Sequence, residues 1–355
     1  LRVSVGAGGS GGHVFPVFGV AKGLVEEGCL VEWLGTQRGL EAEVVPQSGF
    51  LIHFLDITGV RGKNLLTLLL APLRIIKAII SVCGILKRFD PDLVVGLGGY
   101  VAGPGGIAAW LLRKPLVIHE QNAIAGTTNK VLARFAKRVL TGFPKVFPHG
   151  EFIGNPVRKE ICELVKPHNI NKSGLNLLIM GGSLGAVALN EVVPASLREL
   201  RGLTSDFAEL SVFHQTGKKK CEETQLLYKQ LEVDATIEPF ISDMAERLLW
   251  ADLVICRAGA LTIAELSNAG LASVLVPFPY AVDDHQTENA NWLVEERAAI
   301  LMPQAELSPS SLAKVLLKFF EDRSCIVKMS DAAKSVAKPD ATLRFKQICL
   351  EVANV

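Results

Sequence analysis

The sequence VSVGAGGSGGH at residues 3–13 joins a short apolar run to a glycine-rich turn. The sequence LNLLIMGGSLGA at residues 175–186 repeats this arrangement in the second half of the chain. A strand that leads through such a turn into a helix leaves free backbone N–H groups at the helix N-terminus, where they bind phosphate or another electron-rich group. Two such turns predict two nucleotide-binding folds that face each other across a cleft.

Apolar segments of strand length alternate with amphipathic segments of helix length along the whole chain. This βαβ rhythm predicts an α/β protein with doubly wound parallel sheets and helices on both faces. The helices that stand out most are expected at residues 14–27, 68–88, 187–200 and 286–296. The expected strands are 2–5, 30–35, 51–56, 92–96, 116–119 and 138–141 in the first half, and 175–180, 211–215, 235–238, 252–255, 273–276 and 299–302 in the second.

The two halves also share a strand that begins with aspartate. The sequence PDLVVGLGG at 91–99 resembles ADLVICRAG at 251–259, and each lies well downstream of the glycine turn of its half. Two Rossmann-like domains of similar construction are therefore expected. The segment 142–174 holds several Pro, Gly and Asn residues and is the expected linker zone. We place the boundary inside it, with one domain at 1–155 and the other at 156–337.

Composition excludes several classes of function. The 355 residues have a formal net charge of +1 and 6% aromatic side chains, which argues against a nucleic-acid partner. The seven cysteines form no CxxC pair and no cluster with metal-ligand spacing, which predicts reduced thiols in a cytoplasmic protein and no metal site. A strand with its glycine turn begins almost at residue 1, so no signal peptide is expected.

The first turn also matches the dinucleotide-binding pattern through Gly6, Gly8 and Gly11. That pattern requires an acidic residue at the end of the second strand to hold a ribose. Glu32 lies inside the expected strand 30–35, and no acidic residue closes it. An NAD-dependent enzyme is therefore disfavoured.

Two further patterns are also set aside. A Walker A loop needs Ser or Thr after its lysine, but Gly217-Lys218 is followed by Lys219. The sequence Asp90-Pro91-Asp92 spells a metal-binding DxD pattern, but it precedes a strand and so lies at the wrong end of the sheet. We assign it to capping and to the start of the strand.

His13 ends the first glycine turn at the start of a helix. One interpretation is a capping or packing histidine, and the other is a general base. An ordinary pKa of about 6.5 suits a side chain that takes a proton at neutral pH. The helix N-terminus disfavours the cationic form, which keeps such a base neutral.

In the second half, the sequence RAGALTIAE at 257–265 forms a strand-end turn that leads into a helix. Its small residues let a ligand approach the backbone. Glu265 would lie one turn inside the helix, either as an acceptor of two ribose hydroxyl hydrogen bonds or as a solvated carboxylate. The sequence DDHQTEN at 283–289 opens another helix, and it either grips a sugar or caps the helix through Asp283 or Asp284.

Residues 60–88 combine a long apolar run with six basic and no acidic side chains. Arg74 and Lys77 interrupt the run, so it does not suit a membrane span. A basic, strongly apolar surface helix fits peripheral contact with an anionic membrane. The alternative is an ordinary core helix with solvated Lys and Arg ends.

Taken in order, these motifs resemble the MurG family of undecaprenyldiphospho-muramoylpentapeptide β-N-acetylglucosaminyltransferases over about the whole chain. The residues that carry the resemblance are GGSGGH (8–13), VRGK (60–63), GLGGYVAGPGG (96–106), HEQNAIAGTTN (119–129), GNPVR (154–158), GGSLGA (181–186), CRAGALTIAE (256–265) and DDHQTENA (283–290).

The resemblance implies the two-domain GT-B fold, with a C-terminal helix near 338–355 that packs back on the first domain. It implies inverting transfer of N-acetylglucosamine from UDP-GlcNAc to the 4-hydroxyl of the MurNAc of lipid I, which gives lipid II in peptidoglycan synthesis. No cofactor or metal is expected. The implied location is the cytoplasmic face of the bacterial inner membrane. There the first domain would bind acceptor and membrane, the second would bind UDP-GlcNAc, and other cell-wall synthesis proteins are possible partners.

The resemblance also implies individual roles. His13 would be the catalytic base. The family usually has threonine where this chain has Ser10, which keeps the hydroxyl. A glutamine pair usual in the family is His285-Gln286 here, so which of the two grips the sugar is left open. The implied donor contacts are Ser10, Gly11, Gly12, Asn122, Arg158, Ser183, Ile241, Ala260, Leu261, Thr262, Ile263, Ala264, Glu265 and Gln286.

Two other classes of protein also fit part of this sequence. A UDP-GlcNAc 2-epimerase shares the fold and the donor, but it has no lipid acceptor and no use for the basic, apolar segment 60–88. A non-catalytic sugar-nucleotide binder would hold UDP-GlcNAc without releasing UDP.

Overall fold

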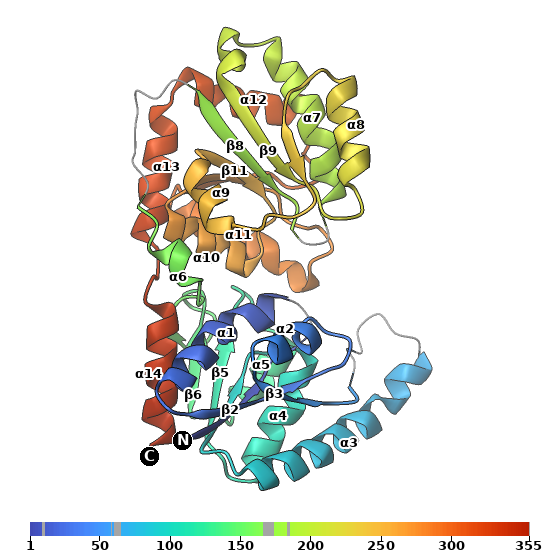
Figure 1. The fold of residues 1–355 in the computed structure, drawn as a ribbon, viewed down its shortest axis with the longest axis vertical. Coiled ribbons are helices and arrows are strands. Elements are labelled where there is room, and N and C mark those ends of the chain that lie inside the picture. The colour runs from blue at the N-terminus through green and yellow to red at the C-terminus, as the bar shows by residue number, and fades with distance from the viewer. Residues whose placement is uncertain (9–10, 58, 60–64, 166–173, 183–184, 355) are drawn as a thin grey trace. The chain divides into compact units, whose positions relative to one another are not determined.

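The computed structural model describes residues 1–8, 11–57, 59, 65–165, 174–182 and 185–354. The chain divides into two compact units (Figure 1). Unit 1 comprises Leu1–Val157 and Pro339–Val355, and unit 2 comprises Arg158–Lys338. Unit 1 is thus assembled from two separate stretches of sequence, whereas unit 2 is one continuous stretch.

Within the described residues of unit 1, seven parallel strands form one sheet in the order β3-β2-β1-β4-β5-β6-β7. The order reverses between β1 and β4, which makes the sheet doubly wound and places the first glycine turn at the reversal. The strands are β1 (Arg2–Gly6), β2 (Leu30–Gly35), β3 (Leu51–Phe54), β4 (Leu93–Gly96), β5 (Leu116–Glu120), β6 (Arg138–Thr141) and β7 (Glu151–Phe152).

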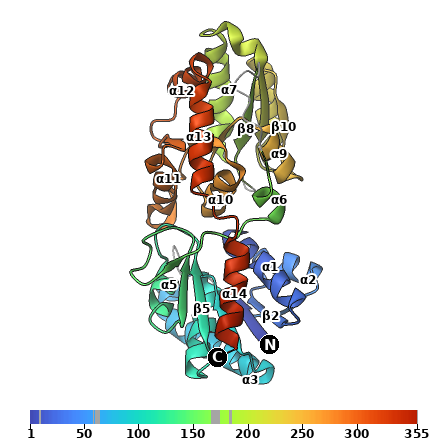
Figure 2. The ribbon, with the colours of Figure 1, turned by 90° about the vertical axis from the view of Figure 1, so that its left-hand side faces the viewer.

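Helices cover both faces of this sheet. On one face, α14 packs along α1, and the core there includes Val17, Leu24, Phe345 and Ile348 (Figure 2). On the other face, α3 packs on α4 and α4 packs on α5. The helices are α1 (Gly11–Glu26), α2 (Glu41–Gln47), α3 (Leu65–Phe89), α4 (Gly99–Leu111), α5 (Thr127–Leu132) and α14 (Ala341–Ala353).

Unit 2 repeats the plan with six strands in the order β10-β9-β8-β11-β12-β13 over its described residues. Helix α7 packs on α12 and on α8, and α10 contacts α9, α11 and α13. The strands are β8 (Leu175–Met180), β9 (Leu210–Gln215), β10 (Thr236–Glu238), β11 (Leu253–Cys256), β12 (Ala272–Leu275) and β13 (Ala299–Leu301). The helices are α6 (Lys159–Cys162), α7 (Val187–Arg201), α8 (Cys221–Gln230), α9 (Met244–Trp250), α10 (Ala260–Ala269), α11 (His285–Glu295), α12 (Pro309–Glu321) and α13 (Ser324–Ser335), with short 3-10 turns at Ser205–Glu209 and Val282–Asp284.

The aspartates that precede β4 and β11 do the same work in both units. The Asp92 carboxylate accepts a hydrogen bond from the backbone N–H of Arg2 at 2.8 Å, and that of Asp252 accepts from Asn176 N–H at 2.9 Å. Each fastens the start of its strand to the neighbouring first strand. Asp90 binds Lys114 Nζ at 2.6 Å, and this hydrogen bond lowers the pKa of Asp90. The DxD sequence therefore helps to begin β4, as its position suggested.

All twelve expected strands are present, three with the expected bounds and the others with ends shifted by at most two residues. The sequence did not predict β7, because a two-residue strand leaves no pattern of alternation. It lies inside the segment 142–174 that was expected to be a linker, and the boundary between the units follows Val157. Among the described helices, none is sufficiently long and apolar to span a bilayer.

Phe345 anchors α14 to the rest of unit 1. Its side chain is fully buried and stacks on the His119 ring with 5.2 Å between centroids. We expect Phe345→Ala to lower the free energy of unfolding by about 3–5 kcal/mol, because the lost contacts leave a cavity. Urea denaturation of the full chain measures this.

The matched control is Leu343→Ala on the same helix, where the side chain is 49% exposed. This change should stay within about 0.5 kcal/mol of the parent. Equal losses for the two variants would show that α14 is not held through its buried face.

Candidate active site

The carboxyl edge of the second sheet gathers most of the expected donor contacts. Met180 at the end of β8 lies in register with Gln215 of β9 and with Cys256 of β11. The segments that follow these strands therefore leave the sheet at the same edge. The strand order reverses between β8 and β11, and such a reversal is where open α/β sheets bind ligands.

The second glycine turn runs close to neighbouring backbone. Gly182 and Gly185 have φ of +77° and +79°, which favour glycine. A Cβ at Gly185 would meet the carbonyl oxygen of Thr216, and one at Gly181 would lie 2.8 Å from the Ala186 nitrogen. The glycines thus allow a tight turn ahead of α7. Ser183, an expected donor contact, lies outside the described residues.

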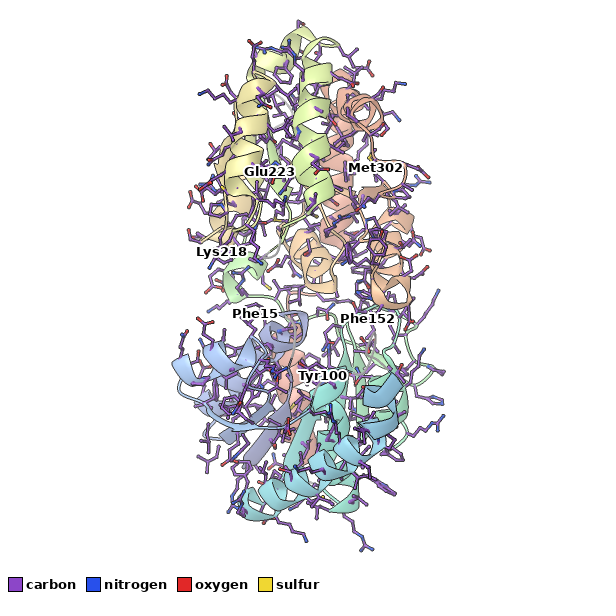
Figure 3. The ribbon with its side chains drawn as sticks, turned by 90° about the vertical axis from the view of Figure 1, so that its right-hand side faces the viewer. Phe15, Tyr100, Phe152, Lys218, Glu223 and Met302 are labelled. Atoms are coloured by element: carbon purple, nitrogen blue, oxygen red, sulfur yellow. The ribbon has the colours of Figure 1, made fainter. Side chains whose placement is uncertain are left out.

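The side-chain amide of Gln215 holds this turn in place through two hydrogen bonds. Its Nε2 donates to Gly182 O at 2.8 Å, and its Oε1 accepts from Gly182 N–H at 2.9 Å. The same Nε2 donates to Pro239 O at 3.1 Å. Ile241, another expected donor contact, follows Pro239 by two residues and is buried. The loop after β9 continues through Lys218 toward α8, on which Glu223 lies (Figure 3).

The expected contacts at 260–265 form the first two turns of α10. Gly259 precedes the helix in an extended conformation without a side-chain cap. Ala260, Ile263 and Ala264 are buried, and Leu261 and Thr262 are half-buried. The start of α10 thus presents small side chains and backbone N–H groups at the sheet edge, which suits an electron-rich ligand.

Glu265 forms an ion pair with Arg158, with 2.9 Å between Oε1 and Nη2. The Glu265 side chain is 18% exposed and that of Arg158 is 55% exposed. Burial raises the pKa of Glu265, and the nearby Arg158 guanidinium offsets this only in part. The alternative of a solvated helix carboxylate is therefore wrong, because most of the side chain is removed from water.

His285 and Gln286 begin α11 and have different local roles. Gln286 Oε1 accepts from the backbone N–H of Phe278 at 2.9 Å, which fixes the orientation of its amide. The Nδ1 of His285 donates to Val282 O at 2.7 Å. Of the two aspartates that the capping alternative named, Asp284 does not cap the helix. Asp284 at the N-cap makes no side-chain bond to the helix backbone and instead accepts from Thr287 Oγ1.

The first glycine turn belongs to unit 1 and is also crowded. A Cβ at Gly8 would lie 2.6 Å from Oε1 of Glu41, whose buried carboxylate accepts from Thr36 N–H at 2.9 Å. Helix α1 begins at Gly11, so Gly11, Gly12 and His13 form its first turn. Ser10 and the side chain of His13 lie outside the described part of the chain.

Two exposed or partly exposed aromatic residues lie near the starts of helices α1 and α4. Phe15, two residues beyond His13 on α1, is 53% exposed, and Tyr100 on α4 is half-buried (Figure 3). Tyr100 follows Gly98 and Gly99, whose φ values of +78° and +70° let the chain turn from β4 into α4. Both helix starts lie at the carboxyl edge of the first sheet, because β1 and β4 are parallel neighbours.

Asn122 lies in a loop that is organised by a buried glutamate. The Glu120 carboxylate accepts from Asn122 N–H at 3.1 Å, from Gly126 N–H at 3.0 Å and from Asn129 Nδ2 at 2.9 Å. His119 and Glu120 belong to β5 itself rather than to the loop after it. His119 is buried against Phe345, and burial lowers its pKa to about 4. Glu120 thus shapes the loop, and His119 supports α14.

The described residues include no cluster suited to a metal ion. They contain no group of three or more His, Cys, Asp or Glu side chains placed to hold an ion. All seven cysteines are free thiols, and burial raises the pKa of Cys256 to about 12.

Comparison with known proteins assigns both halves of the chain. Residues 3–141 match the glycosyltransferase family 28 N-terminal domain, and residues 176–345 match the glycosyltransferase family 28 C-terminal domain. The chain belongs to glycosyltransferase family 28. The resemblance to the MurG family that its motifs predicted is confirmed by curated relatives and by a solved structure.

Two of these relatives bear the same name, UDP-N-acetylglucosamine--N-acetylmuramyl-(pentapeptide) pyrophosphoryl-undecaprenol N-acetylglucosamine transferase. The protein of Marinobacter nauticus is 49% identical over 98% of this chain and 96% of its own length. That of Methylococcus capsulatus is 48% identical over 99% of both. The crystal structure of Acinetobacter baumannii MurG matches with a TM-score of 0.83 and 41% identity over 99% of each chain.

Solved structures of more distant proteins share the fold. The glycosyltransferase of kitacinnamycin matches with a TM-score of 0.71 at 15% identity, which shows likeness of fold alone. The expected GT-B class of two Rossmann-like, doubly wound parallel-sheet domains is confirmed by these matches and by both sheet orders. A family 28 member is a glycosyltransferase, as the resemblance implied.

Two organising residues, Gln215 and Glu41, were missed by the sequence analysis. Gln215 ends a buried strand, where a polar side chain is the available signal, and Glu41 lies at the start of a short helix. Gln215 binds Gly182, which lies 33 positions earlier in the chain, so only the fold brings these two residues together. Glu120 was already part of the predicted motif at 119–129, and its partners Asn122, Gly126 and Asn129 are close to it in sequence.

The raised pKa of Glu265 leads to a test at this site. The pKa of Glu265 is raised from its ordinary value of 4.5. Above pH 4.5, the folded chain therefore holds the Glu265 proton more tightly than the unfolded chain does. The ionised carboxylate therefore lowers stability as pH rises, and this effect is absent below 4.5. We expect Glu265→Gln to match or exceed the parent in melting temperature at pH 7.5, with the advantage vanishing toward pH 4.5.

Glu163→Gln is the matched control, because Glu163 also pairs with a cation, Lys159 at 3.6 Å, but is 65% exposed. It should change the melting temperature little at either pH. A Glu265→Gln variant that is less stable than the parent only at the higher pH would mean that attraction to Arg158 exceeds the cost of burial.

Proposed function

We propose that this chain transfers N-acetylglucosamine from UDP-GlcNAc to the 4-hydroxyl of the MurNAc of lipid I, with inversion at the anomeric carbon. The product is lipid II, the lipid-linked disaccharide of peptidoglycan synthesis. The names of the relatives support this substrate pair. The observation that carries it is the mostly buried Glu265 carboxylate beside Arg158, at the sheet edge where the glycine turn leaves β8.

Unit 2 is the donor half in this proposal. The turn at 181–186, with Ser183 and Arg158, takes the diphosphate. Glu265 accepts hydrogen bonds from the ribose hydroxyls, and Gln286 donates from its amide to the transferred sugar. The remaining donor contacts, Ile241 and the start of α10 at 260–264, are buried or half-buried, so they offer backbone groups and apolar contact rather than charge.

Gln286 is the better candidate than His285 for gripping the sugar. Both side chains have one polar atom engaged with the local backbone. The bond from Phe278 N–H must go to the amide oxygen of Gln286, which leaves the NH₂ group as the end presented to a ligand. An NH₂ group supplies two donors, which suits the oxygens of a sugar.

Unit 1 is the acceptor half. His13 takes the proton of the acceptor 4-hydroxyl, and that oxygen forms a bond to the anomeric carbon. The bond from this carbon to the UDP oxygen breaks with its electron pair, so charge develops on the departing diphosphate. Fixed donors at the turn and Arg158 stabilise this charge, and they should affect turnover more than donor affinity. Ser10, Gly11, Gly12 and Asn122 of this unit complete the proposed contacts with the donor.

Helix α3 is the proposed membrane contact on the inner face of the bacterial membrane. Its buried side, with Ala78 and Val82, joins the core of unit 1. Its outer side exposes Leu73, Ile76 and Ile80, which are 64%, 53% and 67% exposed and follow one stripe of the helix. Arg74, Lys77, Lys87 and Arg88 are also exposed. Apolar and basic side chains on one surface helix suit an anionic bilayer. The basic residues at 60–64 lie outside the described residues.

Acceptor dependence tests the reaction. The chain is incubated with UDP-GlcNAc labelled in the sugar, with and without a lipid I analogue, and UDP release is followed. We expect UDP release only with the acceptor, together with label on the lipid. A 2-epimerase would convert the sugar without acceptor, and a mere binder would release no UDP, so either result would reject the proposal.

The same assay tests the base. His13→Ala should lower kcat by about 10²–10⁴-fold, because a positioned general base contributes that much, and should change the donor KM little. His285→Ala is the matched histidine control in the donor half and should keep most of the turnover. A His13→Ala enzyme with near-normal kcat would remove His13 from this role.

Vesicle binding tests the membrane contact. The double variant Arg74→Glu, Lys77→Glu should bind vesicles containing anionic lipid about 30-fold more weakly or worse, because each basic residue near the surface contributes about 1 kcal/mol. The control is Lys314→Glu, Lys318→Glu on α12, which makes the same charge change at exposed positions of unit 2. If both double variants lose the same amount of vesicle binding, the cause is the change in net charge and not the loss of a contact through α3.

A further inference from the structure

We propose that Gln215 is a positioning residue for the donor, because its side-chain amide holds two donor-binding segments of unit 2 in one arrangement. This inference rests on the proposed function, which assigns the turn at 181–186 and Ile241 to the donor. Nothing in the motifs of the chain points to this residue, since it ends a buried strand.

The amide makes a two-way contact with a single residue of the turn. Gly182 N–H donates to Gln215 Oε1 at 2.9 Å, and Gln215 Nε2 donates to Gly182 O at 2.8 Å. Gly182 has φ of +77°, and a Cβ placed on it would meet open space. Crowding therefore does not fix this residue, and the amide supplies the restraint on both of its peptide groups.

The second hydrogen of Nε2 bonds to another segment, and we call the three hydrogen bonds of this amide the Gln215 clamp. Nε2 donates to Pro239 O at 3.1 Å, just after β10 ends at Glu238. Ile241 lies two residues farther along the chain. One side chain on β9 thus connects the turn that follows β8 with the loop that follows β10, across three neighbouring strands.

Burial makes these bonds effective restraints. Gln215 is 4% exposed, so a lost bond is poorly replaced by water and leaves buried polar groups unsatisfied. Backbone bonds support the same strand end, because Gly181 N–H donates to Gln215 O and Thr216 N–H donates to Glu238 O, each at 3.0 Å. The strand end is therefore fixed independently, and the side chain can position the two donor segments against it.

The pattern of donors and acceptors selects glutamine. A neutral carboxamide accepts from one N–H and donates to two carbonyls, as all three partners here require. Glutamate has the same shape, but its carboxylate would face the Gly182 and Pro239 carbonyl oxygens without a proton. Methionine has a similar length and satisfies none of the three partners. The two substitutions therefore separate shape from hydrogen bonding.

The test compares Gln215→Met and Gln215→Glu with the parent enzyme. We expect the KM for UDP-GlcNAc to rise at least about tenfold in both, while the KM for the lipid I analogue stays within about twofold. Calorimetry with UDP and with uridine should show that the affinity advantage of UDP over uridine shrinks, because the diphosphate turn is misplaced. Hydrogen exchange should become faster at the backbone N–H groups of Gly181 and Gly182 and at those of residues 240–242.

Asn176→Leu is the matched control. Asn176 is a half-buried amide at the other end of β8, and its Nδ2 donates to Trp250 O at 2.8 Å. It should lower the melting temperature without changing the KM for UDP-GlcNAc or the ratio of UDP to uridine affinity. If the Gln215 variants only lower the melting temperature as Asn176→Leu does, the residue is merely structural and the inference is wrong.

Glu265→Ala distinguishes failure of this inference from failure of the proposed function. If Glu265→Ala raises the donor KM and Gln215→Met does not, the donor site stands and the clamp is rejected. If neither variant changes the donor KM, the assignment of unit 2 to the donor fails as well.

Discussion

Parallel pairing of the strands is the constraint on which the rest of the molecule depends. In a parallel sheet, every strand ends at the same edge, so segments distant in sequence begin their loops side by side. Met180, Gln215 and Cys256 end neighbouring strands in register, and the turn at 181–186 and α10 follow from that edge. Unit 1 obeys the same rule with β1 and β4. Functional residues need not be close in sequence, because the sheet edge collects them.

Buried polar groups carry the second level of organisation. Glu41, Glu120 and Gln215 are each less than 5% exposed, and each binds backbone N–H groups of a loop at a sheet edge. Burying such groups is unfavourable unless they are hydrogen-bonded, and their bonds in turn fix the backbone that they contact. The loops that present ligand-binding groups are therefore held by side chains that do not themselves face the ligand.

Much of the fold could be predicted from the sequence, and particular residues show why. The alternation of apolar runs and glycine turns is local, so the twelve main strands and the helix at 68–88 were predicted. The strand that begins with aspartate, at Asp92 and again at Asp252, is also a local pattern, and it predicted two similar units. The site was harder. The clamp of Gln215 on Gly182 and the contact of Glu41 with the first turn join residues more than 30 positions apart. Burial of Glu265 likewise depends on tertiary packing, which no local pattern records.

The position of α14 has a consequence for synthesis of the chain. The apolar side of α1, with Val17, Val20 and Leu24, is covered in part by Phe345 and Ile348. A ribosome makes about 5–20 residues per second, so this side of α1 stays without α14 for roughly tens of seconds while the whole of unit 2 is synthesised. Unit 2 is one continuous stretch of sequence, so all of its strands and helices are synthesised before α14 is. The part of the protein that begins the chain is thus the last to complete its core.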